Sequence, residues 1–114
     1  MSEDTLFHKI IRRELPADVV YEDDDCIAIR DINPQAPVHL LLIPKTTLPR
    51  LADAEPAHAE MLGRLLVKAG EVARAAGIGD AFRLVVNNGA GACQTVFQLH
   101  LHILGGRPLS WPPG

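Results

Sequence analysis

The sequence predicts one α+β domain with a largely antiparallel sheet of about five strands, one long helix and a short N-terminal helix. The first observation is size, since 114 residues, 47% hydrophobic and 22% charged, suit a single soluble domain with its own core. The second is that β-rich segments follow one another without regular alternation with helices. The third is one long segment whose apolar residues recur at helical spacing. Residues 1–114 therefore form one predicted domain.

The N-terminal segment predicts a short helix. Its apolar residues Phe7 and Ile10 recur at helical spacing. Ser2 or Asp4 supplies the N-cap, and Pro16 ends the helix. The segment is polar and acidic and lacks the apolar run of a signal peptide, which predicts a cytoplasmic protein.

The next two segments predict three consecutive strands. VVYEDDDCIAIRD, residues 19–31, is typical of a hairpin whose β-rich arms flank the acidic turn Asp23–Asp25. VHLLLIPK, residues 38–45, predicts the third strand, because the prolines of the intervening loop cannot continue a hydrogen-bonded ladder. The apolar run Val38–Ile43 is far too short to span a bilayer, so we expect no membrane association.

The second half of the chain predicts the long helix and two further strands. The helix extends from Ala54 to Ala76, and its apolar stripe consists of Met61, Leu62, Leu65, Ala69, Val72 and Ala76. FRLVVNN, residues 82–88, and TVFQLHLHIL, residues 95–104, predict the last two strands. Residues 107–114 are too rich in proline for regular structure and form an irregular C-terminal tail.

Charge and cysteine usage narrow the function classes. A net charge of −3 and a pI near 5.9 argue against binding a nucleic-acid backbone, which needs a basic face, but allow a local site for a small anion. Cys26 and Cys93 lie far apart and lack CxxC spacing, so we expect free thiols in a reducing cytoplasm.

Two histidines interrupt the apolar strand predicted over residues 95–104. Successive side chains of a strand alternate between faces, so Gln98, His100 and His102 share one face. The opposite face carries Phe97, Leu99, Leu101 and Ile103. His39 interrupts the third predicted strand in the same way. Three histidines from two strands are therefore expected to converge on one face of the sheet.

Three interpretations of this cluster are open. It is a partly exposed polar sheet face, or a zinc site built from H-x-H and a third histidine, or a site for phosphate chemistry. No paired cysteines or clear carboxylate ligand lie nearby in the sequence to support zinc. The loop NNGAGACQT, residues 87–95, favours phosphate, because its glycines let backbone amides approach an anion closely. The other histidines, His8 and His58, fall in helical segments and are expected at the surface.

The motifs resemble those of a known family. QTVFQLHLHILGGRPLSWPPG, residues 94–114, is similar to the signature and C-terminal tail of the histidine-triad (HIT) nucleotide-binding proteins. The resemblance continues through residues 7–45, and the ending WPPG points to the branch of purine nucleoside phosphoramidases. It implies a HIT-like fold. The chain departs from the family pattern at the first triad position, where Gln98 replaces a histidine.

The resemblance also implies a reaction. It suggests a metal-independent hydrolase without a cofactor, which cleaves purine nucleoside 5'-phosphoramidates or acyl adenylates of the AMP-lysine type. His100 Nε2 would attack the α-phosphorus, and water would then cleave the nucleotidyl-histidine intermediate. His102 or Thr95 would assist the leaving group. The backbone carbonyl of Gln98 would accept the Nδ1 proton of His100, a role that survives the loss of the histidine side chain.

Ligand contacts and assembly follow from the same resemblance. Phosphate and ribose would be held by His39, Asp31, Asn87, Gln94 and Gly89, with the Asp31 carboxylate on the ribose hydroxyls. The purine slot would consist of Phe7, Ile10, Ile29, Ile32 and Leu41. The family forms homodimers, which here would meet through the long helix and the strand predicted over 82–88. Trp111 would reach the partner's active site.

Two other classes of function are compatible with the sequence. A non-catalytic purine-nucleotide-binding or scaffold protein would keep Asp31 and the apolar slot but lack turnover, and the replacement at Gln98 fits that idea. A zinc-binding structural protein would hold the metal through His39, His100 and His102.

Overall fold

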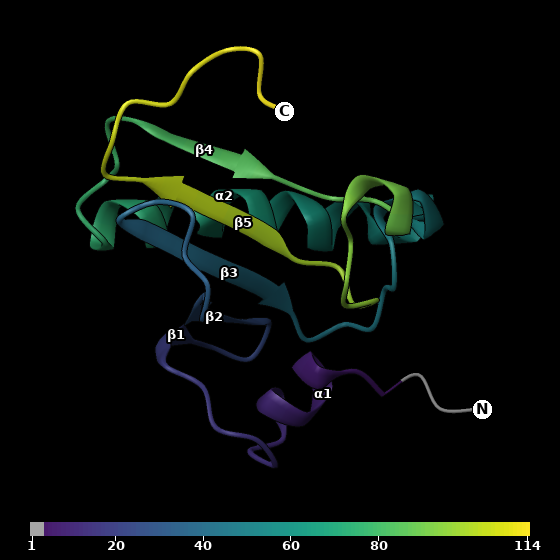
Figure 1. The fold of residues 1–114 in the computed structure, drawn as a ribbon. Coiled ribbons are helices and arrows are strands. Elements are labelled where there is room, and N and C mark those ends of the chain that lie inside the picture. Colours follow the sequence, from purple (N-terminus) through teal and green to yellow (C-terminus); the bar gives the residue numbers. More distant parts are fainter. Residues whose placement is uncertain (1–3) are drawn as a thin grey trace.

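The computed structural model describes residues 4–114, and its elements follow the predicted order (Figure 1). The helices and strands are α1 (Leu6–Ile11), β1 (Val19–Glu22), β2 (Cys26–Arg30), β3 (Val38–Pro44), α2 (Ala59–Ala75), β4 (Phe82–Val85) and β5 (Leu101–Gly105). Single 3₁₀ turns lie at Leu51–Asp53, Pro56–His58 and Ala90–Ala92.

The five strands form one antiparallel sheet in the order β1-β2-β3-β5-β4, which confirms the predicted α+β class. The last strand of the chain, β5, is inserted between β3 and β4. This insertion places the histidine of β3 beside the histidine of β5.

The sheet buries side chains on both faces. Helix α2 lies along one face (Figure 1), and the α1 residues Phe7 and Ile10 pack against part of the other. On β3, Leu40 and Leu42 belong to the core under α2, whereas Leu41 and Ile43 belong to the core that contains the α1 residue Phe7. This alternation along one strand explains why the segment is continuously apolar.

The predicted stripe of α2 is correct at its centre and wrong at its C-terminal end. Leu65, Ala69 and Val72 are buried against the sheet. Ala76 is exposed, and Ala73 is buried in its place. The helix also begins at Ala59 rather than Ala54, because a tight 3₁₀ turn that starts at a proline forms its first turn.

The N-terminal helix differs from its prediction at both ends. Thr5 is the N-cap, since its hydroxyl accepts the backbone N–H of His8, and Asp4 has no such role. The alternative cap, Ser2, lies outside the described residues. The helix ends at Ile11, well before Pro16, and Arg13 adopts a positive φ of 64°.

The strand predicted over residues 95–104 is shorter than expected. Only β5 is regular, and residues 95–100 form an irregular approach to it. Phe97, expected in the core, is 42% exposed. The backbone N–H of Leu99 donates instead to the carbonyl of Leu48 at 2.7 Å, so this segment is fastened to the chain that follows β3.

Two further expectations concern the cysteines and the membrane. Cys26 is buried and Cys93 exposed, and both are free. Among the described residues, no helix combines the length and the apolar character needed to cross a membrane.

Candidate active site

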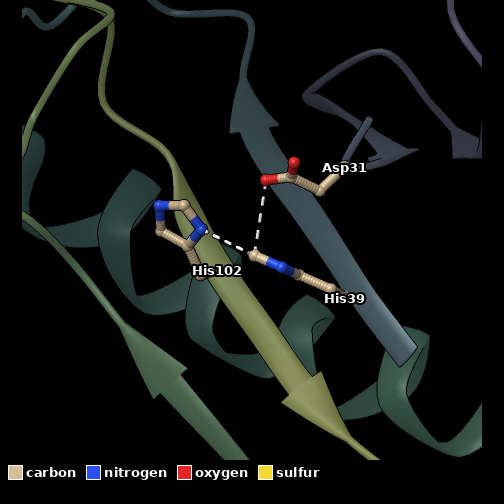
Figure 2. A group of neighbouring side chains, drawn as sticks. All are labelled: Asp31, His39 and His102. Atoms are coloured by element: carbon tan, nitrogen blue, oxygen red, sulfur yellow. Dashed lines mark hydrogen bonds and ion pairs between the residues drawn. The ribbon is translucent and has the colours of Figure 1, made fainter. Parts of the chain in front are cut away.

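Asp31, His39 and His102 meet on the face of the sheet opposite α2 (Figure 2). Leu41 pairs with His102 across β3 and β5, which makes His39 the diagonal neighbour of His102 on the same face. Asp31 follows β2 and donates its backbone N–H to the carbonyl of His39. His39 Nε2 consequently lies 2.9 Å from His102 Nδ1 and 3.4 Å from Asp31 Oδ2.

The hydrogen bonds of His39 determine which ring nitrogens carry protons. The backbone N–H of Gln35 donates to His39 Nδ1 at 3.0 Å, so that nitrogen is an acceptor. A neutral imidazole has one donor and one acceptor, so His39 carries its proton on Nε2 and donates it to His102 Nδ1. We therefore assign the proton of His102 to its Nε2.

His100 has the opposite tautomer. Its Nδ1 lies 2.7 Å from the carbonyl oxygen of Gln98, which only accepts, so Nδ1 carries the proton and Nε2 has a free lone pair. The His100 ring is 7% exposed and packs at 5.1 Å from the ring of His102. The ring of Phe7 also packs against His100, with the ring centroids 4.9 Å apart and the planes at 86° in a T-shaped contact.

All three imidazoles are held neutral. Burial is the main cause that lowers the pKa of His39 and of His100 below 6.5, although Asp31 and the Gln98 carbonyl, respectively, oppose the shift. Burial also lowers the pKa of His102 to about 4, and repulsion from His100 and His39 in their charged forms adds to the effect. The cluster thus offers a lone pair at His100 Nε2 and an N–H at His102 Nε2 at neutral pH.

The glycine-rich loop is arranged differently from the sequence expectation. Gln94, expected to hold phosphate, is buried and uses its whole amide to shape the loop. Its Oε1 accepts the N–H of Gly89 at 2.8 Å, and its Nε2 donates to the carbonyls of Pro49 and Val96. These bonds leave neither the Gln94 amide nor the Gly89 N–H free for an anion. In the part of the chain described, no hydrogen bond is donated by the backbone N–H of Thr95.

Four of the five residues expected to line the purine slot lie together. Phe7, Ile10, Ile29 and Leu41 belong to one apolar cluster. Ile32 does not join it and is 99% exposed.

Within residues 4–114, the other predicted contact residues make no hydrogen bond or ring contact with the histidines. Asn87 is half-buried after β4, Thr95 is exposed, and Trp111 is 81% exposed in the tail. A cavity of about 600 Å³ alongside α2 is lined by Asp31 and His39 but not by His100 or His102.

Sequence reasoning missed the contacts of two other histidines. His8 is expected at the surface, but its Nδ1 accepts the N–H of Thr5 and its Nε2 lies 3.1 Å from Thr47 Oγ1. His58 likewise accepts the N–H of Glu55 and caps the turn before α2. The spacing of a cap residue followed three positions later by a polar side chain was the available signal for both.

The cluster does not fit a resident zinc ion, although Asp31, His39 and His102 offer ligand atoms within 4.8 Å of one another. A metal-bound imidazole carries its proton on the other ring nitrogen and donates it. His39 would bind through Nε2, which places that proton on Nδ1 against the N–H of Gln35. Two donors would then face each other, so we derive no chemistry from a metal here.

Comparisons with known proteins agree with this fold. A family model described as HIT domain matches residues 12–109. The crystal structure of a HIT family hydrolase from Legionella pneumophila superposes with a TM-score of 0.94 at 46% identity, covering 97% of this chain and all of that one.

Two plant relatives are similar along the chain. The "14 kDa zinc-binding protein" of Zea mays is 53% identical over 96% of this chain and 88% of its own. "Adenylylsulfatase HINT1" of Arabidopsis thaliana is 51% identical over 96% of this chain and 76% of its own.

Proposed function

This chain belongs to the HIT domain family of nucleotide-binding hydrolases, and we propose that it cleaves purine nucleoside 5'-phosphoramidates or acyl adenylates through a nucleotidyl-His100 intermediate. One observation carries the proposal. Two neighbouring neutral imidazoles have opposite tautomers, so that His100 offers a nucleophile where His102 offers a donor.

In the first step, the lone pair of His100 Nε2 attacks the α-phosphorus and the phosphorus–leaving-group bond breaks. Positive charge then develops on the His100 ring, and the Gln98 carbonyl stabilises it through the Nδ1–H. A nucleoside phosphate bound to an imidazolium remains as the intermediate.

The leaving group needs a proton, and the pKa of His102 limits its role. With a pKa of about 4, only roughly one His102 ring in a thousand is protonated at neutral pH. His102 Nε2–H therefore acts as a hydrogen-bond donor to the developing charge rather than as a full acid. An amine leaves with a proton that comes from water, either directly or relayed through the Thr95 hydroxyl, which regains a proton from solvent. The oxygen of a second water then bonds to phosphorus as the phosphorus–nitrogen bond breaks. The electron pair of that bond returns to His100 Nε2 and the water's proton passes to solvent, which releases the nucleoside monophosphate and neutral His100.

The nucleotide would lie with its ribose on Asp31 and its base against the apolar cluster around Phe7. Asp31 Oδ1 already accepts the N–H of Asn33, which leaves Oδ2 for a ribose hydroxyl. Phosphate oxygens would be held by His102 Nε2–H and by the free backbone N–H of Thr95, with Asn87 on the ribose side. Gln94 and Gly89 would contribute by shaping the loop.

We also propose that the protein is a cytoplasmic homodimer. β4 is an edge strand with an unpaired side, and the exposed face of α2 carries Leu66 and Val67, which are 57% and 65% exposed. Trp111, exposed in the tail, would contact the leaving group in the partner's site. Light scattering should give the dimer mass for the wild type and the monomer mass for Leu66→Glu.

Turnover of a fluorogenic adenosine phosphoramidate tests the reaction. The wild type should release amine, and an alkaline denaturing quench, which preserves the acid-labile phosphorus–nitrogen bond, should trap a nucleotidyl adduct on the His100 peptide in mass spectra. His100→Ala should bind AMP but show neither turnover nor adduct. Wild-type protein that bound AMP without turnover would be a scaffold, and near-normal turnover by His100→Ala would exclude this mechanism.

A further inference from the structure

Gln98 has side-chain contacts that the family pattern does not predict. It is fully buried, and its Oε1 accepts the N–H of Leu48 at 3.1 Å. Its Nε2 donates to the carbonyls of Pro44 at 3.0 Å and Thr46 at 2.8 Å. One amide thus holds three backbone groups of the segment 44–48, which begins at the last residue of β3.

A neutral histidine could not reproduce this arrangement. Its ring offers one donor and one acceptor, whereas the Gln98 amide supplies two donors and one acceptor to this segment. The glutamine is therefore matched to the backbone it contacts. A buried backbone group left without its partner would be costly.

The segment 44–48 in turn holds helix α1. Thr47 Oγ1 lies 3.1 Å from Nε2 of His8, a residue of α1. The residue before it in the helix, Phe7, makes a T-shaped ring contact with His100. The side chain of Gln98 is thereby connected, through one backbone segment and one side-chain hydrogen bond, to the ring that packs against His100.

The backbone of Gln98 acts on His100 directly, because its carbonyl accepts the Nδ1–H. We propose that Gln98 is a positioning residue that orients His100 twice, through its own carbonyl and through the 44–48 segment, Thr47, His8 and Phe7. The kinetic consequence rests on the proposed function, whereas the structural consequence does not.

Thr47→Val is the sharpest perturbation, because it removes only the hydroxyl that joins the segment to α1. Thr46→Val is its matched control. Both residues are exposed, but the Thr46 hydroxyl has no hydrogen bond among the described residues, and its carbonyl, which Gln98 holds, survives the substitution. Neither residue belongs to the proposed binding or catalytic machinery.

NMR of the free protein tests the positioning without substrate. The ring protons of His100 lie in the ring current of Phe7, so Thr47→Val should shift their resonances and those of the ring nitrogens, whereas Thr46→Val should leave them at wild-type values. If the Thr47 hydroxyl contributed only to stability, the ring-proton and ring-nitrogen resonances of His100 in folded Thr47→Val would stay at wild-type values. His100 resonances of Thr47→Val that match those of Thr46→Val would overturn the proposal.

Kinetics with the adenosine phosphoramidate provide the second readout. The free energy of one neutral hydrogen bond corresponds to a roughly two- to tenfold change in rate. If His100 is misoriented in Thr47→Val, this change should be a decrease in kcat. A rise in KM alone would mean that α1 only lines the nucleoside slot, which contradicts the proposal. If the wild type has no turnover, the proposed function fails while the NMR comparison still decides the positioning.

Gln98→His is a third variant, in which the contacts of residue 98 are only partly removed. It retains the backbone carbonyl and at most two of the three side-chain hydrogen bonds. Its His100 resonances should shift in the same direction as those of Thr47→Val. A Gln98→His protein with unshifted His100 resonances would show that the side chain does not position the ring.

Discussion

Acid should destabilise this protein in a pH range set by its buried imidazoles. Burial lowers the pKa of His102 to about 4, whereas an unfolded histidine titrates near 6.5. The unfolded state therefore binds the proton more readily than the folded state. The stabilising contribution of the neutral ring is fully present above pH 6.5 and is lost as the pH falls toward 4.

The two pKa values set the size of the effect. At about 1.4 kcal/mol per pH unit, the difference corresponds to about 3 kcal/mol of unfolding free energy at most. The ring of His102 is only half-buried, so solvent screening should reduce the loss to about 2 kcal/mol. The carboxylates act at lower pH. The hydrogen bond from Tyr21 lowers the pKa of Asp23 to about 2, so its contribution disappears only as the pH falls from 3.8 toward 2.

Urea unfolding followed by circular dichroism between about pH 7.5 and about pH 4.5 measures this loss. His102→Gln keeps a neutral hydrogen-bonding side chain that does not titrate, and its stability should fall about 2 kcal/mol less than that of the wild type over this interval. If the unfolding free energies of the two proteins depend equally on urea concentration, the substitution has not changed the unfolded state. If the unfolding free energies of the two proteins fell by the same amount over this pH interval, titration of His102 would not be the cause of the acid destabilisation.

Three further predictions concern the reaction. His102→Ala should keep measurable turnover under conditions where His100→Ala has none, because water can replace a hydrogen-bond donor but not a nucleophile; equal rates of the two variants would contradict the assigned roles. Asp31→Asn should weaken AMP binding in calorimetry by about tenfold or more, since a charged hydrogen bond contributes roughly 1.5–3 kcal/mol. Unchanged affinity would remove Asp31 from the site. Chelator-treated protein should keep its full rate, and a loss that added zinc restores would reject the metal-independent scheme.

The elements that could be predicted are those encoded by local periodicity. The apolar run of β3 and the stripe of α2 around Leu65 and Ala69 appear in the fold as expected. The first six residues of the strand predicted over 95–104 are irregular, because Gln98 bonds to backbone groups about fifty positions away. No local sequence pattern encodes these distant bonds. The displaced start of α2 was a boundary error of the ordinary kind.

The grouping of the three histidines could be predicted from the sequence, but the tautomers of their rings could not. H-x-H spacing correctly placed His100 and His102 together, and His39 joined them through the register of β3 and β5. The tautomers depend on the N–H of Gln35 and the carbonyl of Gln98, whose directions follow from loop shape. For the same reason, Gln94 was expected to bind a ligand although its amide faces its own loop.

The position of β5 between β3 and β4 has a consequence for biosynthesis. Among the described residues, β4 has β5 as its only neighbour in the sheet, and β5 pairs with β3 over residues 38–42. A nascent chain from which residues 101–105 have not yet emerged from the ribosome therefore has an unpaired β4 and an open edge on β3. Such a chain also lacks His102. Because β5 is synthesised after β1 to β4, completion of the sheet and assembly of the histidine cluster coincide. Until β5 pairs with its neighbours, Asp31, His39 and His100 are present without their partner His102.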